Sequence, residues 1–378
     1  MPLAFVSFIQ YILAFVLVFM ILPKLMLRNG GSGFTEVFFA DFIQMVLLVT
    51  VTGYILVLTK LFEFISILIV FLVMILRKYY FSKPATLRHK TVKEIRAWLS
   101  DYTEGLVDLP GILMRKAKAK LSSAFANTGS GIMFAGKAVF VALAAGYMLY
   151  IRLYDAFVNT APAMSDAYVT LAWVKYINNR ILFHDGIYPQ GYYIYQAFIQ
   201  KFSGLDPLYV LKFTGPIASA LIAYSIYFVV SKLLKCRYSG FIAAVAYGLY
   251  GIVFTGSWER QAASNSQEFG FLFIMPCIYF FYKYVKSGEK KDLIVAASSA
   301  AAVGLIHALA FIYAVFGIII LAAAVLMTDF GRFRKSALRS AGAVVAAAVV
   351  SLIPAGVGFI MGKELHSASA EFAAAASG

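Results

Sequence analysis

The sequence predicts an all-α protein, a polytopic transmembrane helical bundle of about ten spans with a helical first large external loop. Two observations predict this class. Hydrophobic residues make up 62% of the 378 residues and charged residues only 13%, whereas charged residues alone approach a quarter of a soluble domain. Several apolar stretches also reach the roughly 20 residues with which a helix crosses about 30 Å of hydrocarbon. We therefore expect a lipid bilayer to surround most of the chain.

The first apolar run, 3–22, is expected to be a span rather than a cleaved signal peptide. It has no basic segment before it, and Pro23 and Lys24 follow it in place of a small-residue cleavage site. The expected spans are 3–23, 38–58, 62–77, 131–151, 208–231, 239–257, 268–285, 292–308, 310–327 and 340–361. The stretch 38–77 also allows one long tilted helix in place of two spans.

Positive charges orient these spans. With the N-terminus outside, 25 of the 33 Lys and Arg residues fall on the cytoplasmic side. The eight others are Lys60, Arg152, Lys175, Arg180, Lys201, Lys212, Arg260 and Lys363. Because cytoplasmic loops carry an excess of Lys and Arg, this orientation is predicted. The net charge of +15 then indicates loops at an anionic membrane surface, and no nucleic-acid partner is expected.

The spans and loops divide the chain into four expected parts. These are an N-terminal module of three spans at 1–77, a basic cytoplasmic segment at 78–130, a transmembrane core at 131–361 and an external or frayed tail at 362–378. The core contains the large external loop, 152–207. In the basic segment, apolar residues from Val92 to Leu109 recur at alternating intervals of three and four. This spacing predicts an amphipathic helix on the inner leaflet, or one packed on a neighbouring subunit.

The external loop holds most of the polar chemistry of the outer face. Asp166 is placed to act as a general base toward a hydroxyl or amide, or to hold a divalent cation such as Mg²⁺ or Mn²⁺. Helix capping is the alternative role, and the residue pattern alone favours it, because Asp166 directly precedes a helical stretch. Asp185 and Tyr188 fit either a binding site or a turn beside an interfacial aromatic belt.

Four more ionisable residues are expected on the same side of the membrane. Glu259, Arg260 and Glu268 concentrate in a short loop, where the arginine is suited to a lipid phosphate or is simply solvated with its neighbours. His307 lies at the external end of an expected span, which indicates either a functional residue or a helix-packing histidine. The convergence of these groups with Asp166 on one face favours a site there.

Other chemistry is disfavoured by the sequence. The stretch Gly131 to Lys137 has the glycine and lysine spacing of a phosphate-binding loop, but no Ser or Thr follows the lysine. Cys236 and Cys277 are expected at or within the membrane, so they are interpreted as free thiols.

Four motifs together resemble the GT-C superfamily of membrane glycosyltransferases. They are Ser165-Asp166-Ala167-Tyr168, the stretch Asp185-Gly186-Ile187-Tyr188-Pro189-Gln190-Gly191-Tyr192, the pair Ser264-Asn265 and Gly304-Leu305-Ile306-His307. The superfamily includes protein mannosyltransferases, the catalytic subunit of oligosaccharyltransferase and many bacterial relatives. The resemblance covers roughly 131–327. One departure is Ala167, because the family often has a second acidic residue directly after the first.

The resemblance implies a function and a location. A GT-C enzyme transfers a sugar from a polyprenyl-phosphate-linked donor to an acceptor, a protein or a glycan, on the outer face of the membrane. Asp166 matches the family's catalytic acidic position in the first large external loop. From their side and depth in the membrane, we expect Arg260 to hold the lipid phosphate and His307 to line the donor pocket. A bacterial-type plasma membrane is the implied location.

Two other classes of function are also compatible with the sequence. One is a transporter or flippase for a lipid-linked or polar solute, which requires polar residues deep within the spans. The other is a membrane assembly scaffold, for which the cytoplasmic helix at 92–109 is essential and Asp166 is not.

Overall fold

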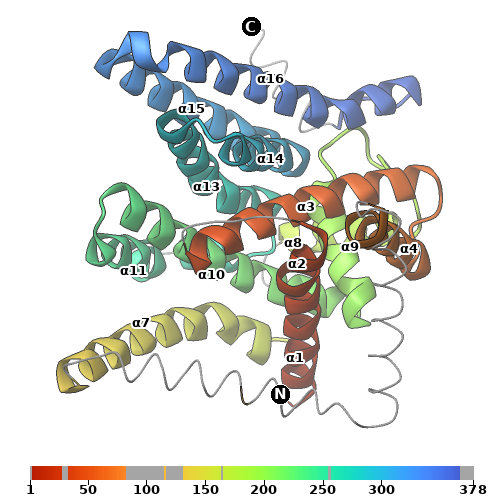
Figure 1. Ribbon diagram of the computed structural model, residues 1–378. Helices are drawn as coiled ribbons and strands as arrows, with labels where there is room; N and C mark the ends of the chain where they lie inside the picture. The colour runs from red at the N-terminus through yellow and green to blue at the C-terminus, as the bar shows by residue number, and fades with distance from the viewer. Residues whose placement is uncertain are drawn as a thin grey trace, which may run out of the picture. The chain divides into compact units, whose positions relative to one another are not determined.

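The computed structural model shows an all-helical chain (Figure 1). It describes residues 2–27, 33–81, 115, 131–162, 165–253 and 257–366. Within these ranges the one β feature is an isolated bridge between Ile187 and Leu365. The predicted all-α class is confirmed for this part of the chain. The predicted amphipathic helix at 92–109 lies outside the described residues, as do residues 367–378 of the predicted tail.

Seven helices of the described part are long and apolar enough to cross a membrane. They are Leu3–Met26, Phe34–Leu58, Val139–Val158, Pro207–Leu233, Ser266–Ser287, Ala308–Thr328 and Phe330–Ile360. The other three expected spans correspond to shorter helices: α4 (Phe64–Leu76), α11 (Arg237–Val253) and α14 (Lys290–Ile306), of 13, 17 and 17 residues. The structure therefore supports a multi-pass membrane protein, and the expected count of about ten spans is not confirmed.

The end of α3 decides between two alternatives of the sequence interpretation, and the start of α16 differs from it. Helix α3 (Phe34–Leu58) ends before a break at 59–63, where Lys60 has a φ of +63°. The stretch 38–77 is therefore not one long helix. Helix α16 (Phe330–Ile360) begins well before the expected span 340–361, because the side chain of Asp329 caps it by accepting from the N–H of Arg332 at 3.0 Å. The basic stretch after Asp329 is thus helical instead of a loop.

The chain divides into two compact units, residues 1–67 with 148–378 and residues 68–147. The smaller unit contains most of α4, a π-helical turn (Arg77–Phe81) and the first part of α7 (Gly131–Val158). The larger unit carries every residue discussed below. Its long helices α15 (Ala308–Thr328) and α16 expose large apolar side chains such as Ile320 and Leu352. Such exposure on helices of spanning length indicates contact with lipid.

An aromatic core joins the N-terminal helices to the rest of the larger unit. The first span consists of α1 (Pro2–Val16), a π-helical turn (Leu17–Ile21) and α2 (Leu22–Met26). Phe19 of this span packs on Phe42 of α3 and on Tyr195 of α9 (Gly191–Ser203), with ring centroids 5.4 and 5.1 Å apart. Tyr195 in turn contacts Phe269 of α13 (Ser266–Ser287) at 4.5 Å. All four rings are buried, so they anchor α9 against three membrane helices.

Local sequence signals mark where the helices that carry the site begin and end. The side chain of Asp206 caps α10 (Pro207–Leu233) and that of Asn265 caps α13, accepting from N–H groups at 2.8 and 2.7 Å. Gly204, with a φ of +68°, ends α9 in the left-handed conformation that favours glycine. Helices α8 (Ser165–Asn178) and α12 (Ser257–Ala262) complete the outer region.

Helix ends that the charge pattern assigns to one side lie together in the structure. At the predicted cytoplasmic side, Lys283 of α13 pairs with Glu36 of α3 and with Asp292 of α14. At the predicted outer side, Lys60 donates to the carbonyl of Arg180 at 2.6 Å, and Gly191 lies close to the carbonyl of Leu305. This grouping agrees with the predicted alternation of the helices, whereas the absolute orientation stays a prediction.

Candidate functional site

Four separate segments meet at the predicted outer ends of the helices and form the candidate site. We define the outer cluster as Asp166, Tyr188, Asn265, Ser266 and His307. The amide nitrogen of Asn265 donates to a carboxylate oxygen of Asp166 at 3.3 Å. The side chain of Ser266 lies beside the Tyr188 hydroxyl, and the Tyr188 and His307 rings are 6.2 Å apart between centroids. The structure thus brings together three of the seven site residues predicted from the sequence.

Asp166 lies in the first turn of α8, with its side chain exposed. In the described part of the chain its carboxylate accepts a hydrogen bond from Asn265 and from no backbone N–H group. A side-chain cap is therefore not seen among the described residues, whereas the position in the first turn agrees with the favourable interaction of an acidic side chain with the helix dipole, which the residue pattern also indicated. Since Asn265 also caps α13 through its side-chain oxygen, one amide connects the Asp166 carboxylate to the start of a membrane helix. The carboxylate keeps lone pairs free for a ligand.

The loop that carries Asp185 and Tyr188 is held in a strained conformation. Phe183, which is buried, has a φ of +57°, and Gly186 has a φ of +105°. A bulky residue with positive φ costs free energy, and such residues concentrate at functional sites. The hydroxyl of Tyr54 in α3 accepts a hydrogen bond from the backbone N–H of Gln190 at 2.6 Å. Helix α3 therefore anchors the end of the loop.

Asp185 belongs to the support of this loop. It accepts from the indole N–H of Trp173 at 2.8 Å and lies 2.5 Å from the Nδ1 atom of His184. The hydrogen bond with His184 is the main cause that lowers the pKa of Asp185, and the bond from Trp173 adds to it. His184 stacks on Tyr176 with a centroid distance of 3.7 Å. The predicted binding residue Asp185 thus fixes the loop to α8 through Trp173.

The predicted charged residues of the 259–268 stretch divide between two locations. Arg260 pairs with Glu268 at 3.3 Å and donates to the side-chain oxygen of Gln267 at 3.1 Å. Its side chain is 47% exposed, so the guanidinium keeps N–H groups free for an anion from solvent or lipid. Glu268 is largely buried at the start of α13. Glu259 lines a cavity, whereas Arg260 and Glu268 are not among the residues that line it.

His307 occupies the break between α14 and α15, where its backbone is extended. Its Nδ1 atom is buried and has no hydrogen-bond partner among the described residues. Gly270 of α13 lies close to its Cβ atom, since a side chain on that glycine would come within 3.7 Å. The distance of 3.7 Å is an ordinary contact, whereas a Cβ atom on Gly270 would lie only 2.8 Å from the Cβ atom of Ala310, so the glycine allows α15 to pack closely on α13 beside His307.

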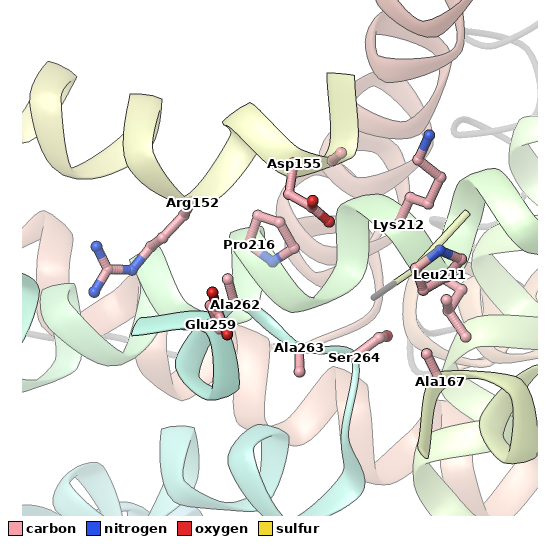
Figure 2. A pocket seen from close by; sticks show the side chains of 12 residues that line it. Arg152, Asp155, Ala167, Leu211, Lys212, Pro216, Glu259, Ala262, Ala263 and Ser264 are labelled. Carbon is pink, nitrogen blue, oxygen red and sulfur yellow. The ribbon is translucent and has the colours of Figure 1, made fainter. Parts of the chain in front are cut away.

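A cavity of about 100 Å³ lies beside the outer cluster. Figure 2 shows that α7 contributes Arg152 and Asp155 to its lining, while Glu259 and Ser264 come from α12 and the segment after it. Lys212 of α10 is the second cation in the lining, and it donates to the carbonyl of Asn159 at 2.5 Å. Two carboxylates and two cations thus surround the cavity. Ala167, the neighbour of Asp166, also lines it.

Arg152 is one of three charged residues of this cavity, with Asp155 and Lys212, that were not among the site residues predicted from the sequence. It is 2% exposed, and its guanidinium points away from the carboxylate of Asp155 (Figure 2). Its hydrogen bonds go to neutral oxygens: the Ser219 hydroxyl at 2.6 Å, the Gln261 amide at 2.7 Å and backbone carbonyls at 3.1 to 3.2 Å. The sequence interpretation ended the span at 151 and assigned Arg152 to the external loop, whereas α7 continues to Val158 and places Arg152 within the candidate span Val139–Val158. Charges within a membrane span are rare and usually functional.

No protein-family model and no curated protein matches this chain. The resemblance to GT-C glycosyltransferases therefore rests on the four sequence motifs alone. Each of the four motifs contributes to the outer cluster, through Asp166, Tyr188, Asn265 and His307 respectively.

The described residues around Asp166 include no cluster of three or more His, Cys, Asp and Glu side chains suited to a metal ion. The contact made by Asp166 is with an amide nitrogen, which is a donor and not a ligand. The Mg²⁺ or Mn²⁺ expected from the sequence stays a prediction, and no step proposed below depends on it.

Proposed function

We propose that the protein is a membrane glycosyltransferase that moves a sugar from a polyprenyl-phosphate-linked donor to an acceptor, a protein or a glycan, on the outer face of the membrane. One observation carries the proposal. An exposed carboxylate, Asp166, lies with an amide, a tyrosine and a histidine at the ends of apolar helices. A site of this kind is accessible to an acceptor from water and to a donor whose lipid tail stays in the bilayer.

The proposed reaction is a displacement at the anomeric carbon. Asp166 takes the proton from an acceptor hydroxyl or amide as that group attacks the carbon. The bond between the anomeric carbon and the phosphate oxygen breaks, and polyprenyl phosphate leaves with the electron pair. Arg260 stabilises the charge that develops on the phosphate through its exposed N–H groups. Asn265 holds the carboxylate of Asp166 in place through the 3.3 Å hydrogen bond.

The test is sugar transfer in membrane vesicles that contain a labelled polyprenyl-phosphate sugar. Asp166→Asn keeps the size and the contact with α13 but removes the base, so we expect transfer to fall by about 10² to 10⁴-fold. Asp206→Asn is the matched control, because Asp206 is also an exposed aspartate at a helix start on the same side. Full transfer by Asp166→Asn would refute the assigned role.

A transporter or flippase for a polar or lipid-linked solute is the second candidate. Arg152 favours it, because this buried cation lies in a candidate span and beside a cavity. Reconstituted liposomes distinguish the two functions. Movement of the lipid-linked sugar between leaflets without any transfer to an acceptor would favour the second candidate.

A further inference from the structure

The segment after α16 returns to the candidate site and pairs with the strained loop. The N–H of Ile187 donates to the carbonyl of Glu364 at 2.7 Å, and the N–H of His366 donates to the carbonyl of Ile187 at 3.2 Å. We call residues 186–187 and 364–366 the clasp. Gly186 is required in the clasp, since its φ is +105° and a Cβ atom there would lie 2.8 Å from the His366 nitrogen.

The clasp places the His366 ring in an aromatic group. His366 packs edge-to-face on Trp173 and Tyr188, with centroid distances of 5.3 and 5.7 Å. Trp173 also packs on Tyr188 at 5.2 Å. Tyr188 therefore contacts the imidazoles of both His307 and His366, although these residues come from different helix ends.

Both imidazoles have unmet hydrogen-bonding capacity. The Nδ1 atoms of His307 and His366 are buried and have no partner among the described residues. Leaving such an atom unpaired is costly, so native sites usually provide a partner. A neutral imidazole nitrogen donates or accepts according to the tautomer, and a hydroxyl group suits either case. Aromatic walls with a few polar groups are typical of sites for small amphipathic ligands.

We propose that His366 is a ligand-binding residue and that, with His307, it binds hydroxyl groups of the donor sugar beside Tyr188. This inference rests on the proposed glycosyltransferase function and deepens it, because it assigns recognition of the sugar to a segment outside the four motifs. The lipid phosphate is then bound elsewhere. His366 contributes to the preference for a sugar-bearing lipid over polyprenyl phosphate itself.

The experiment measures binding and does not depend on transfer. Trp173 is a local reporter, so its fluorescence is followed in a Trp98→Phe, Trp258→Phe background. The probes are polyprenyl-phosphate glucose, mannose and galactose, together with polyprenyl phosphate that carries no sugar. We expect His366→Phe, which retains the ring packing, to weaken binding of the preferred sugar lipid about five- to tenfold, the value of one hydrogen bond. Binding of polyprenyl phosphate should not change.

Two further variants complete the experiment. Lys363→Gln is the matched control, because Lys363 is exposed in the same segment after α16, and it should keep the sugar preference. His366→Gln supplies a donor and an acceptor again and should recover part of it. If His366→Phe fails to fold, His366→Gln is compared with His366→Leu instead. The sugar preference of the glutamine variant must then exceed that of the leucine variant.

The outcomes separate the inference from the proposed function. If the parent protein prefers a sugar lipid and His366→Phe keeps that preference, the role of His366 is refuted while the proposed function stands. If His366→Phe loses affinity for both kinds of lipid equally, His366 is only structural and the inference is refuted. If the parent protein binds no sugar lipid more tightly than polyprenyl phosphate, the sugar donor of the proposed function is refuted, and the inference with it.

Discussion

Arg152 is a single side chain that connects four parts of the larger unit. Its guanidinium donates to Ser219 of α10, to the Gly248 carbonyl of α11 and to Gln261 of α12, and it lies 5.8 Å from the Tyr247 ring centroid. Its hydrogen bonds therefore satisfy a buried charge without a carboxylate among the described residues. The guanidinium group of arginine carries five N–H donors in one plane, and these reach acceptors on several helices at once.

Arg152→Lys is expected to destabilise the protein by about 2 kcal/mol, because lysine keeps the charge but leaves several of these oxygens unpaired. Thermal unfolding in detergent measures the effect. Arg237→Lys is the control, since Arg237 is exposed at the start of α11. If both variants unfold at the same temperature as the parent protein, the buried hydrogen bonds of Arg152 contribute nothing to stability.

Helices α3, α10, α13 and α14 are joined at their predicted cytoplasmic ends by an ion cluster. Lys283 contacts both Glu36 and Asp292, with 3.0 Å to the latter, and Lys232 lies 3.9 Å from Glu36. The side chains of Glu36 and Asp292 are each 3% exposed. Breaking a buried ion pair on one side leaves an uncompensated charge, which costs more than the pair itself contributes.

Lys283→Met is therefore expected to lower the free energy of unfolding by about 3 to 5 kcal/mol, as two buried carboxylates lose their common partner. Lys290→Met, at an exposed position in the first turn of α14, should have little effect. Adding Glu36→Gln to Lys283→Met removes one of the two buried negative charges and should recover part of the stability. The measurement is denaturant unfolding in detergent, and a double variant no more stable than the single one would contradict the explanation.

The whole molecule has a predicted orientation that its two free cysteines make testable. Helix α10 has 27 residues, so at about 1.5 Å per residue it is longer than the roughly 30 Å of hydrocarbon. Asp206 precedes its outer end and Cys236 follows its inner end. Hydrogen bonds from Ser239 and Tyr238 lower the pKa of Cys236, which raises the fraction of reactive thiolate. Cys277 is fully buried.

A membrane-impermeant maleimide should therefore label Cys236 in inside-out vesicles and not in right-side-out vesicles. Cys277 should stay unlabelled in both, so Cys236→Ser abolishes the signal. The matched control is Asp206→Cys in the Cys236→Ser background, which should label from the opposite side only. Labelling of both positions from the same side would refute the predicted course of α10 across the membrane.

The sequence by itself predicted the class of this protein and three of the five residues of the outer cluster. Apolar length and low charge are set by the thickness of the bilayer, so they predict membrane helices without any knowledge of packing. Turn and capping residues such as Asp206 mark helix starts for equally local reasons. Asp166, Tyr188 and His307 were predicted on one face, and they lie close together.

Only the tertiary structure decided which distant groups meet. The hydrogen bond between Asp166 and Asn265, the neutral partners of Arg152 and the return of His366 to Tyr188 all join residues that are far apart in the chain. Helical periodicity states which face of a helix is apolar, but it does not state which helix covers that face. Bilayer thickness therefore determined the elements of this protein, whereas side-chain packing between them determined its candidate site.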